Sequence, residues 1–187
     1  LLRLAPKSKA TTMNLLDFFD AGVTGYPHAP CFVDCGHDGS VITYAEAGAL
    51  TCRIARGLSA LGLQPGFHGA VLSGNAGAAF TALLGILRAE GVWLPVNARN
   101  STDSNIEFLR DMDCDVLFYH AHYASQAEQI RDKLPGIRHF IALQEAGPAD
   151  LCIAKLTEGQ SAEMFSPPLQ PQALAMITFG TFDADQW

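Results

Sequence analysis

The chain has little basic charge, and this limits the partners that it can bind. Of its 187 residues, 12 are Lys or Arg and 19 are Asp or Glu, which gives a formal net charge of −7 at pH 7. The sequence contains no basic cluster, so neither nucleic acid nor an anionic membrane surface is expected as a partner. Charged residues make up only 17% of the chain, which argues against a disordered protein.

The sequence also lacks an apolar run long enough to cross a membrane. Residues 76–90 are almost continuously apolar, but Arg88 and Glu90 interrupt them before the roughly 18 residues that a membrane helix needs. Residues 1–12 carry three basic side chains and no apolar core, so they do not have the pattern of a secretory signal. We expect them to be a leader or an expression remnant before Met13, which could be a natural start.

The cysteines fit neither a disulfide framework nor a zinc motif. Their number is odd and they are widely spread, which indicates reduced thiols and a cytoplasmic location. Cys31 and Cys35 are separated by three residues, which is not the spacing of a CxxC motif. We expect small core residues at all five positions: Cys31, Cys35, Cys52, Cys114 and Cys152.

Residues 71–97 form the most informative stretch, because they read as strand, turn, helix and strand. The turn is Ser73-Gly74-Asn75, and Asn75 is expected to cap the helix over residues 76–90. Gly91 stands where a left-handed residue ends such a helix, and Pro95 is expected to close the strand over residues 92–94. One helical face is expected to be buried, and its residues are Phe80, Leu83, Leu84 and Leu87. This unit predicts two parallel strands covered by a buried helix.

The same alternation continues on both sides of this unit. A short helix over residues 14–20, with Leu15, Phe18 and Phe19 on its apolar face, precedes a hairpin of residues 31–34 and 41–44. Capping boxes are expected at Thr43 with Glu46 and at Ser104 with Glu107. The remaining helices and strands are expected at residues 44–61, 70–72, 104–112, 115–119, 123–134 and 139–143. The order predicts an α/β fold with an open, mostly parallel sheet and helices on both faces, plus a short N-terminal β-hairpin.

The alternation stops at residue 144. Residues 144–172 are rich in Gly, Pro, Ser, Glu and Gln, and we expect mostly loop with one short strand near residues 151–153. Residues 173–179 are again apolar and predict a last strand. The expected organisation is therefore an α/β subdomain over residues 13–143, an irregular linker over 144–172, and a strand with a truncated phosphate loop over 173–187.

Three groups of residues invite a functional interpretation, but each has a plainer one. His120 and His122 could share a metal ion, yet two ligands are too few, so we expect loop histidines. Ser73 lacks the GxSxG frame of a nucleophile elbow, and we expect a cap or turn residue. The alternating acids Asp111, Asp113 and Asp115 are expected to be solvated turn residues rather than a metal or acid–base site. We therefore predict no metal site and no catalytic residue within this chain.

Residues 177–181 differ from these groups, because a strand there runs into a turn of Gly and Thr. This is the shape of a loop that cradles phosphate through backbone N–H groups. Thr178, Gly180 and Thr181 are the candidate cofactor-binding residues.

An ordered set of short segments resembles the opening part of the adenylate-forming enzymes, a family of acyl-CoA synthetases, aryl-acid ligases and peptide-synthetase adenylation domains. The matching segments are Thr43-Tyr44-Ala45-Glu46, Ala55-Arg56-Gly57-Leu58, Leu61-Gly62-Leu63, Pro65-Gly66, Asn75, residues 84–89, Pro95-Val96-Asn97 and Asp115-Val116-Leu117. The resemblance covers residues 32–181. It implies the N-terminal part of a larger ligase that uses ATP and Mg²⁺ to convert a carboxylic acid into an acyl-adenylate and then transfers the acyl group to a thiol, often coenzyme A.

The resemblance also implies that this chain alone is inactive. Thr178, Gly180 and Thr181 match the start of the family's phosphate loop, but Asp183 and Asp185 do not continue its pattern and Gln186 replaces its lysine. Two other interpretations stay open: a non-catalytic binding or scaffold module that retains the fold, and an unrelated doubly wound nucleotide-binding domain. A small-molecule acid, the remainder of the enzyme and a second copy in a homodimer are the partners that the resemblance allows.

Overall fold

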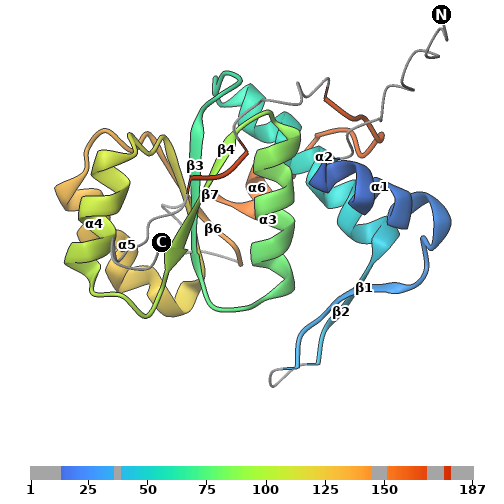
Figure 1. Cartoon of the computed structure of the whole chain (residues 1–187), viewed down its shortest axis with the longest axis horizontal. Coiled ribbons are helices and arrows are strands. Elements are labelled where there is room, and N and C mark those ends of the chain that lie inside the picture. The colour runs from blue at the N-terminus through green and yellow to red at the C-terminus, as the bar shows by residue number, and fades with distance from the viewer. Residues whose placement is uncertain (1–13, 36–38, 145–150, 168–174, 178–187) are drawn as a thin grey trace, which may run out of the picture.

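A parallel sheet forms the centre of the protein. The computed structural model describes residues 14–35, 39–144, 151–167 and 175–177 (Figure 1). Within them, the strand order is β4-β3-β5-β6-β7, and every neighbouring pair is parallel. The strands are β3 (His68–Ser73), β4 (Val92–Asn97), β5 (Val116–Tyr119), β6 (His139–Ala142) and β7 (Leu151–Cys152). The predicted open parallel sheet is confirmed.

Helices cover both faces of this sheet (Figure 1). One face carries α2 (Tyr44–Ala60), α3 (Gly77–Arg88) and α6 (Ile153–Thr157); the other carries α4 (Thr102–Asp111), the 3₁₀ turn η1 (Ala121–Tyr123) and α5 (Ala124–Lys133). Alternate strand residues feed two separate cores, as the pleat requires. Val71 and Phe118 pack with α2 and α3, whereas Leu72 and Leu117 pack with α4 and α5. None of the helices in the described part of the chain has the length and apolar character that a bilayer crossing needs.

The N-terminal part adds a helix and the predicted hairpin. Strands β1 (Pro30–Val33) and β2 (Val41–Thr43) pair antiparallel. Helix α1 (Leu15–Gly25) begins after Asn14, whose side chain accepts the N–H groups of Leu16 and Asp17. The predicted helix ended five residues too early, and its apolar face was partly wrong. Phe19 is buried, but Leu15 and Phe18 are exposed while Leu16 takes the buried position.

The capping box that the sequence predicts for α2 is present. Thr43 Oγ1 accepts the N–H of Glu46 at 3.3 Å, and the Glu46 carboxylate accepts the N–H of Thr43 at 2.9 Å. The backbone N–H of Thr43 and its hydroxyl both donate to the Glu46 carboxylate, and these two hydrogen bonds lower the pKa of Glu46. In α4 the cap is Ser101, which accepts the N–H of Ser104 at 3.2 Å, so the predicted Ser104 cap was one turn too late.

Helix α3 packs closely on α2, but two expectations about it were wrong. A Cβ at Gly85 would lie 2.4 Å from Ile54 Cγ2, so this contact needs glycine. Phe80 is 46% exposed, so it does not lie on the buried face that the sequence predicted. The left-handed residue that follows the helix is Glu90, with φ at 59°, rather than Gly91. Gly91 is needed for space, because a Cβ there would lie 2.5 Å from the Phe67 ring.

Strand β4 continues through Pro95, where the sequence predicted its end. Trp93 donates its N–H to Ala175 O at 2.9 Å, on the side of β4 that faces away from β3. Alternate residues of a strand present their N–H groups to the same side, so the nitrogen of Pro95 also faces away from β3. The pairing of β4 with β3 therefore runs on to Asn97.

Residues 144–172 hold more regular structure than the sequence indicated. The short strand expected near residues 151–153 is β7, which pairs parallel with β6. The helix α6 that follows was not expected, because five residues are too few to show a helical period. It is held by burial of Ile153 and Leu156, and Leu156 lies directly against Gly57 of α2. The domain boundaries at 143 and 172 stay predictions.

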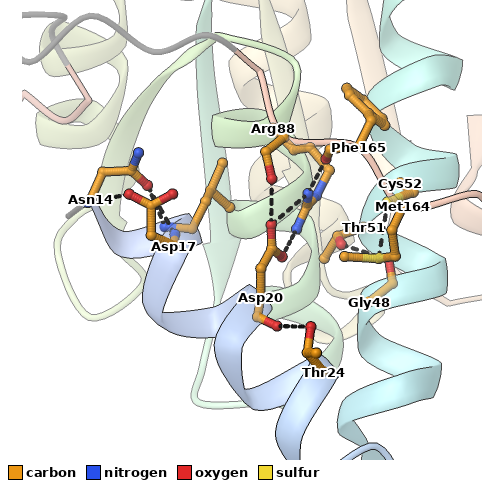
Figure 2. Close-up of polar contacts among 12 residues, drawn as sticks. Asn14, Asp17, Asp20, Thr24, Gly48, Thr51, Cys52, Arg88, Met164 and Phe165 are labelled. Carbon is orange, nitrogen blue, oxygen red and sulfur yellow. Dashed lines mark hydrogen bonds and ion pairs between the residues drawn. The ribbon is translucent and has the colours of Figure 1, made fainter. Parts of the chain in front are cut away.

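A buried arginine joins three segments that are distant in the sequence (Figure 2). The Arg88 side chain is 0% exposed and forms a two-pronged ion pair with Asp20 of α1. It also donates to the carbonyl oxygen of Phe165, and Ser166 Oγ donates to Asp20 Oδ2 at 2.9 Å. The Phe165 ring lies 4.6 Å from the Arg56 guanidinium and 5.9 Å from that of Arg88. We call Asp20, Arg88 and Phe165 the Arg88 clasp.

Replacing Asp20 by Asn should destabilise the protein, because it leaves the buried Arg88 cation without a counter-charge. Breaking a fully buried pair costs about 3–5 kcal/mol, and since Asp20 is 18% exposed we expect about 2–3 kcal/mol in the free energy of unfolding. Urea denaturation measures this difference. The matched control is Asp132→Asn on the exposed surface of α5, which should stay within about 0.5 kcal/mol. Equal stability of the two variants would contradict the role of the clasp.

Candidate functional site

The carboxyl ends of β3, β4 and β5 meet at one edge of the sheet. Strand β3 continues into α3 on one face, whereas β4 and β5 continue into α4 and α5 on the opposite face (Figure 1). In open α/β sheets, ligands bind in the crevice where neighbouring connections leave to opposite faces. This carboxyl edge is therefore the candidate functional site, and it holds Ser73, His120 and His122.

The N-terminus of α3 opens onto this edge, but a carboxylate already occupies it. Asp34, which follows strand β1, accepts the N–H of Gly77 at 2.9 Å and the hydroxyl of Ser40 at 3.2 Å. The cap position is Ala76, and the Asn75 side chain does not cap the helix, so that expectation was wrong. Asp34 lies 43 residues before Gly77, and no local pattern could have indicated the contact.

This carboxylate argues against the unrelated nucleotide-binding domain considered above. Such a domain holds phosphate on the free N–H groups of a glycine-rich turn and the helix behind it. Here the negative charge of Asp34 complements the helix dipole and would repel a phosphate. The turn at residues 73–75 is therefore a poor phosphate site.

The two histidines of the edge contact each other. The backbone N–H of His122 donates to the ring nitrogen Nδ1 of His120 at 3.1 Å. The His122 ring meets the Tyr123 ring edge-on, with 5.0 Å between the ring centroids. Burial lowers the pKa of His120, the neighbouring His122 lowers it further, and Asp34 acts in the opposite direction. Among the residues that the structure describes, no group of three His, Cys, Asp or Glu could hold a metal ion.

Ser73 lines a pocket between α3, the carboxyl half of β3 and the strand β4. The pocket has a volume of about 200 Å³ and is otherwise lined mainly by apolar side chains, among them Phe80 and Leu83 of α3 and Trp93 of β4. Ser73 Oγ is buried and has no hydrogen-bond partner within the described residues. It therefore does not form the cap or turn hydrogen bond that the sequence suggested.

The three aspartates lie at the opposite, amino edge of the sheet, where turns were predicted. Asp111 ends α4, and Asp113 adopts a left-handed conformation with φ at 45°. Asp115 is more than a solvated acid, because it accepts the N–H of His68 at 2.9 Å and pairs with Arg138 at 2.7 Å. These contacts give Asp115 a structural role.

The cysteines are mostly core residues, as expected. Cys52, Cys114 and Cys152 are buried and Cys31 is half-buried, but Cys35 is exposed, so the expectation was wrong there. Burial raises the pKa of the Cys114 thiol to about 12, which keeps it protonated and unreactive at neutral pH.

The predicted phosphate-loop residues Thr178, Gly180 and Thr181 lie outside the described residues. The segment just before them is described, and it runs parallel to β4. Trp93 donates to Ala175 O at 2.9 Å, and Ile177 donates to Trp93 O at 3.1 Å. Parallel pairing directs this segment toward the carboxyl edge of the sheet.

Similarity to known proteins covers most of the chain. Residues 19–180 match the family described as AMP-binding enzyme. A feruloyl-CoA synthase from Amycolatopsis sp is 33% identical over 98 residues, which cover 52% of this chain and 19% of that protein. The AMB antimetabolite synthetase AmbE from Pseudomonas aeruginosa is 36% identical over 88 residues, or 47% of this chain and 4% of that protein. The matches therefore span a fifth or less of these relatives.

Solved structures share the fold at lower identity. The N-terminal domain of FACL13 from Mycobacterium tuberculosis matches with a TM-score of 0.75 and 22% identity, over 90% of this chain and 41% of that one. A benzoate CoA ligase from Burkholderia xenovorans matches with a TM-score of 0.75 and 16% identity, over 88% of this chain and 32% of that one.

Replacing Asp34 by Ala should remove the cap of α3. A lost N-cap costs about 1 kcal/mol, and the missing charge at the helix N-terminus adds to this. Asp34→Asn keeps an acceptor oxygen and should lose about half as much. Urea denaturation of the two variants and the parent measures the differences. An unchanged stability of Asp34→Ala would show that the contact contributes nothing.

The pKa of His120 should lie below the ordinary histidine value of about 6.5. Because the unfolded chain then binds the proton more readily, the stability from neutral His120 is present above about pH 6.5 and is lost as pH falls below it. NMR titration of the imidazole signals tests this directly. We expect His122→Gln to raise the pKa and Asp34→Asn to lower it. A His120 pKa of 6.5 or above would contradict the assignment.

Proposed function

The chain belongs to the AMP-binding enzyme family, and we propose that it forms the N-terminal part of an ATP-dependent ligase for carboxylic acids. In the proposed reaction the carboxylate of a small-molecule acid attacks the α-phosphate of ATP, which forms an acyl-adenylate and releases pyrophosphate. A thiol such as coenzyme A then takes the acyl group and releases AMP. The relatives include two proteins called feruloyl-CoA synthase, which makes an organic acid a reasonable substrate class.

One observation supports this proposal above the others. Residues 175–177 pair parallel with β4 and lead the chain toward the carboxyl edge immediately before Thr178. Phosphate-cradling loops lie at that edge in open parallel sheets. Thr178, Gly180 and Thr181 are therefore proposed to contact the phosphates of ATP.

The described residues do not fit ATP and Mg²⁺ by themselves. Asp34 fills the N-terminus of α3, and the described part of the chain offers no cluster of three metal ligands. A transferring phosphoryl group needs cationic groups or metal ions around it to offset its charge. We therefore propose that the 187-residue chain alone is inactive. A homodimer and a cytoplasmic location also stay proposals.

The alternative is a binding or scaffold module that keeps the fold without catalysis. It is favoured by Asp183, Asp185 and Gln186, because two acids and a missing lysine would weaken the attraction of phosphate. The two proposals differ in whether the protein exchanges pyrophosphate.

ATP–pyrophosphate exchange with a panel of carboxylic acids tests the ligase. The whole reading frame that contains this chain should exchange, whereas the 187 residues alone should not. Thr181→Val should lower kcat/KM for ATP by about tenfold or more, as expected for loss of a donor to a charged oxygen. The matched control is Thr157→Val, since the Thr157 hydroxyl donates to the carbonyl oxygens of Ile153 and Ala154 in its own helix, α6.

Exchange by the isolated 187 residues would contradict the proposed inactivity of this part. Absence of exchange by the whole protein with every acid would favour the scaffold module. Full activity of Thr181→Val would show that the Thr181 hydroxyl does not contribute to phosphate binding.

A further inference from the structure

Residues 161–166 contain no helix or strand, yet side-chain contacts hold them against the helices of one face. Arg56 of α2 donates from Nη1 to Ser161 O at 2.6 Å, and its Cζ lies 4.6 Å from the centroid of the Phe165 ring. The Arg88 clasp holds the other end of these residues through Phe165 O (Figure 2). We call residues 161–166 the anchor segment.

The chain is attached again at residues 175–177, on the side of β4 that faces away from β3. Trp93 donates its N–H to Ala175 O at 2.9 Å, and it accepts the N–H of Ile177 at 3.1 Å. These two hydrogen bonds and the half-buried Ile177 side chain must offset the conformational entropy that three residues lose. Such a short pairing is marginal by itself, so its population depends on how the incoming chain is tethered.

The anchor segment shortens this tether. Ser166 Oγ donates to Asp20 Oδ2 at 2.9 Å, so about eight residues, 167–174, lie between this contact and Ala175. Without the anchor segment the tether would begin after α6 and contain about 17 residues, 158–174. The entropy cost of closing a loop grows with the logarithm of its length, and the shorter tether therefore favours the pairing about threefold.

The attached residues lead directly into Thr178, the first of the residues proposed to contact phosphate. A binding loop whose entry is already ordered gains affinity, because binding does not have to supply that order. We propose that the anchor segment positions the phosphate loop, and that Phe165 is its positioning residue. The meaning of this role rests on the proposed function, but the tether can be tested without ATP.

The test compares two variants of the 187-residue chain that differ only in where eight Gly and Ser residues are inserted. Insertion between residues 170 and 171 doubles the tether, whereas insertion between residues 160 and 161 lies before the anchor segment and leaves the tether unchanged. Amide hydrogen exchange of Ile177, measured by NMR, reports the pairing. The reference amide is Leu143, which donates to Tyr119 O within the sheet. Relative to Leu143, the first insertion should speed exchange of Ile177 about threefold, and the second should leave it unchanged.

Substitutions of Phe165 test the side chain itself. Phe165→Ala removes the ring beside the Arg56 guanidinium but leaves the carbonyl oxygen that Arg88 binds. Exchange of Ile177 should therefore rise about twofold, less than the threefold of complete release. Phe165→Tyr keeps an aromatic ring and should restore the parent rate. The matched control is Phe18→Ala, because the Phe18 side chain on α1 is 64% exposed, and it should not change the rate.

Equal effects of the two insertions on Ile177, whether large or small, would overturn the proposal, because the place of the anchor segment would then be irrelevant. The proposal is also overturned if Phe165→Ala exchanges like Phe18→Ala, or if Phe165→Tyr does not restore the parent rate. Each rate is taken relative to Leu143, so a general loss of stability does not imitate the expected result. Pyrophosphate exchange is measured separately, so either proposal can fail without the other.

Discussion

The buried charge of Arg88 is the constraint on which the packing outside the sheet depends. A guanidinium without solvent must find its partners inside the protein, and here they come from α1 and from the segment around Phe165, 68 and 77 residues away. These contacts hold the N-terminal helix and the chain that returns from α6 against the same end of α3 (Figure 2). The apolar cores stabilise the sheet, whereas the ion pair between Arg88 and Asp20 holds α1 against α3.

Sequence reasoning succeeded where the signal is local and periodic. The alternation of strands and helices, the hairpin and the Thr43–Glu46 capping box all follow from neighbours within about four residues. It failed where a distant residue decides the outcome. Asp34, rather than Asn75, caps α3. Gly91 is required because the Phe67 ring leaves no room for a Cβ, and not because the backbone is left-handed there. The exposure of Phe80 likewise depends on which elements pack around α3, and the helical periodicity of the sequence carries no information about them.

The candidate site shows the same division. The parallel sheet could be predicted, and with it the edge at which a ligand should bind. The burial of Ser73 Oγ and Trp93 Nε1 without a hydrogen-bond partner among the described residues could not, because it depends on tertiary packing. The electrostatic influence of Asp34 on His120 likewise links the end of β1 to the end of β5, which are distant in the sequence. That Thr178, Gly180 and Thr181 form a phosphate loop stays a proposal, and it is based on membership of the family.

Pro95 has one more effect on this architecture. Its nitrogen faces residues 175–177, where the next rung of a parallel ladder would require a donor for the carbonyl of Ile177. Proline has no N–H, so β4 cannot donate this hydrogen bond to the carbonyl of Ile177. Within the described residues, Trp93 therefore makes both of the backbone hydrogen bonds that attach this segment to β4.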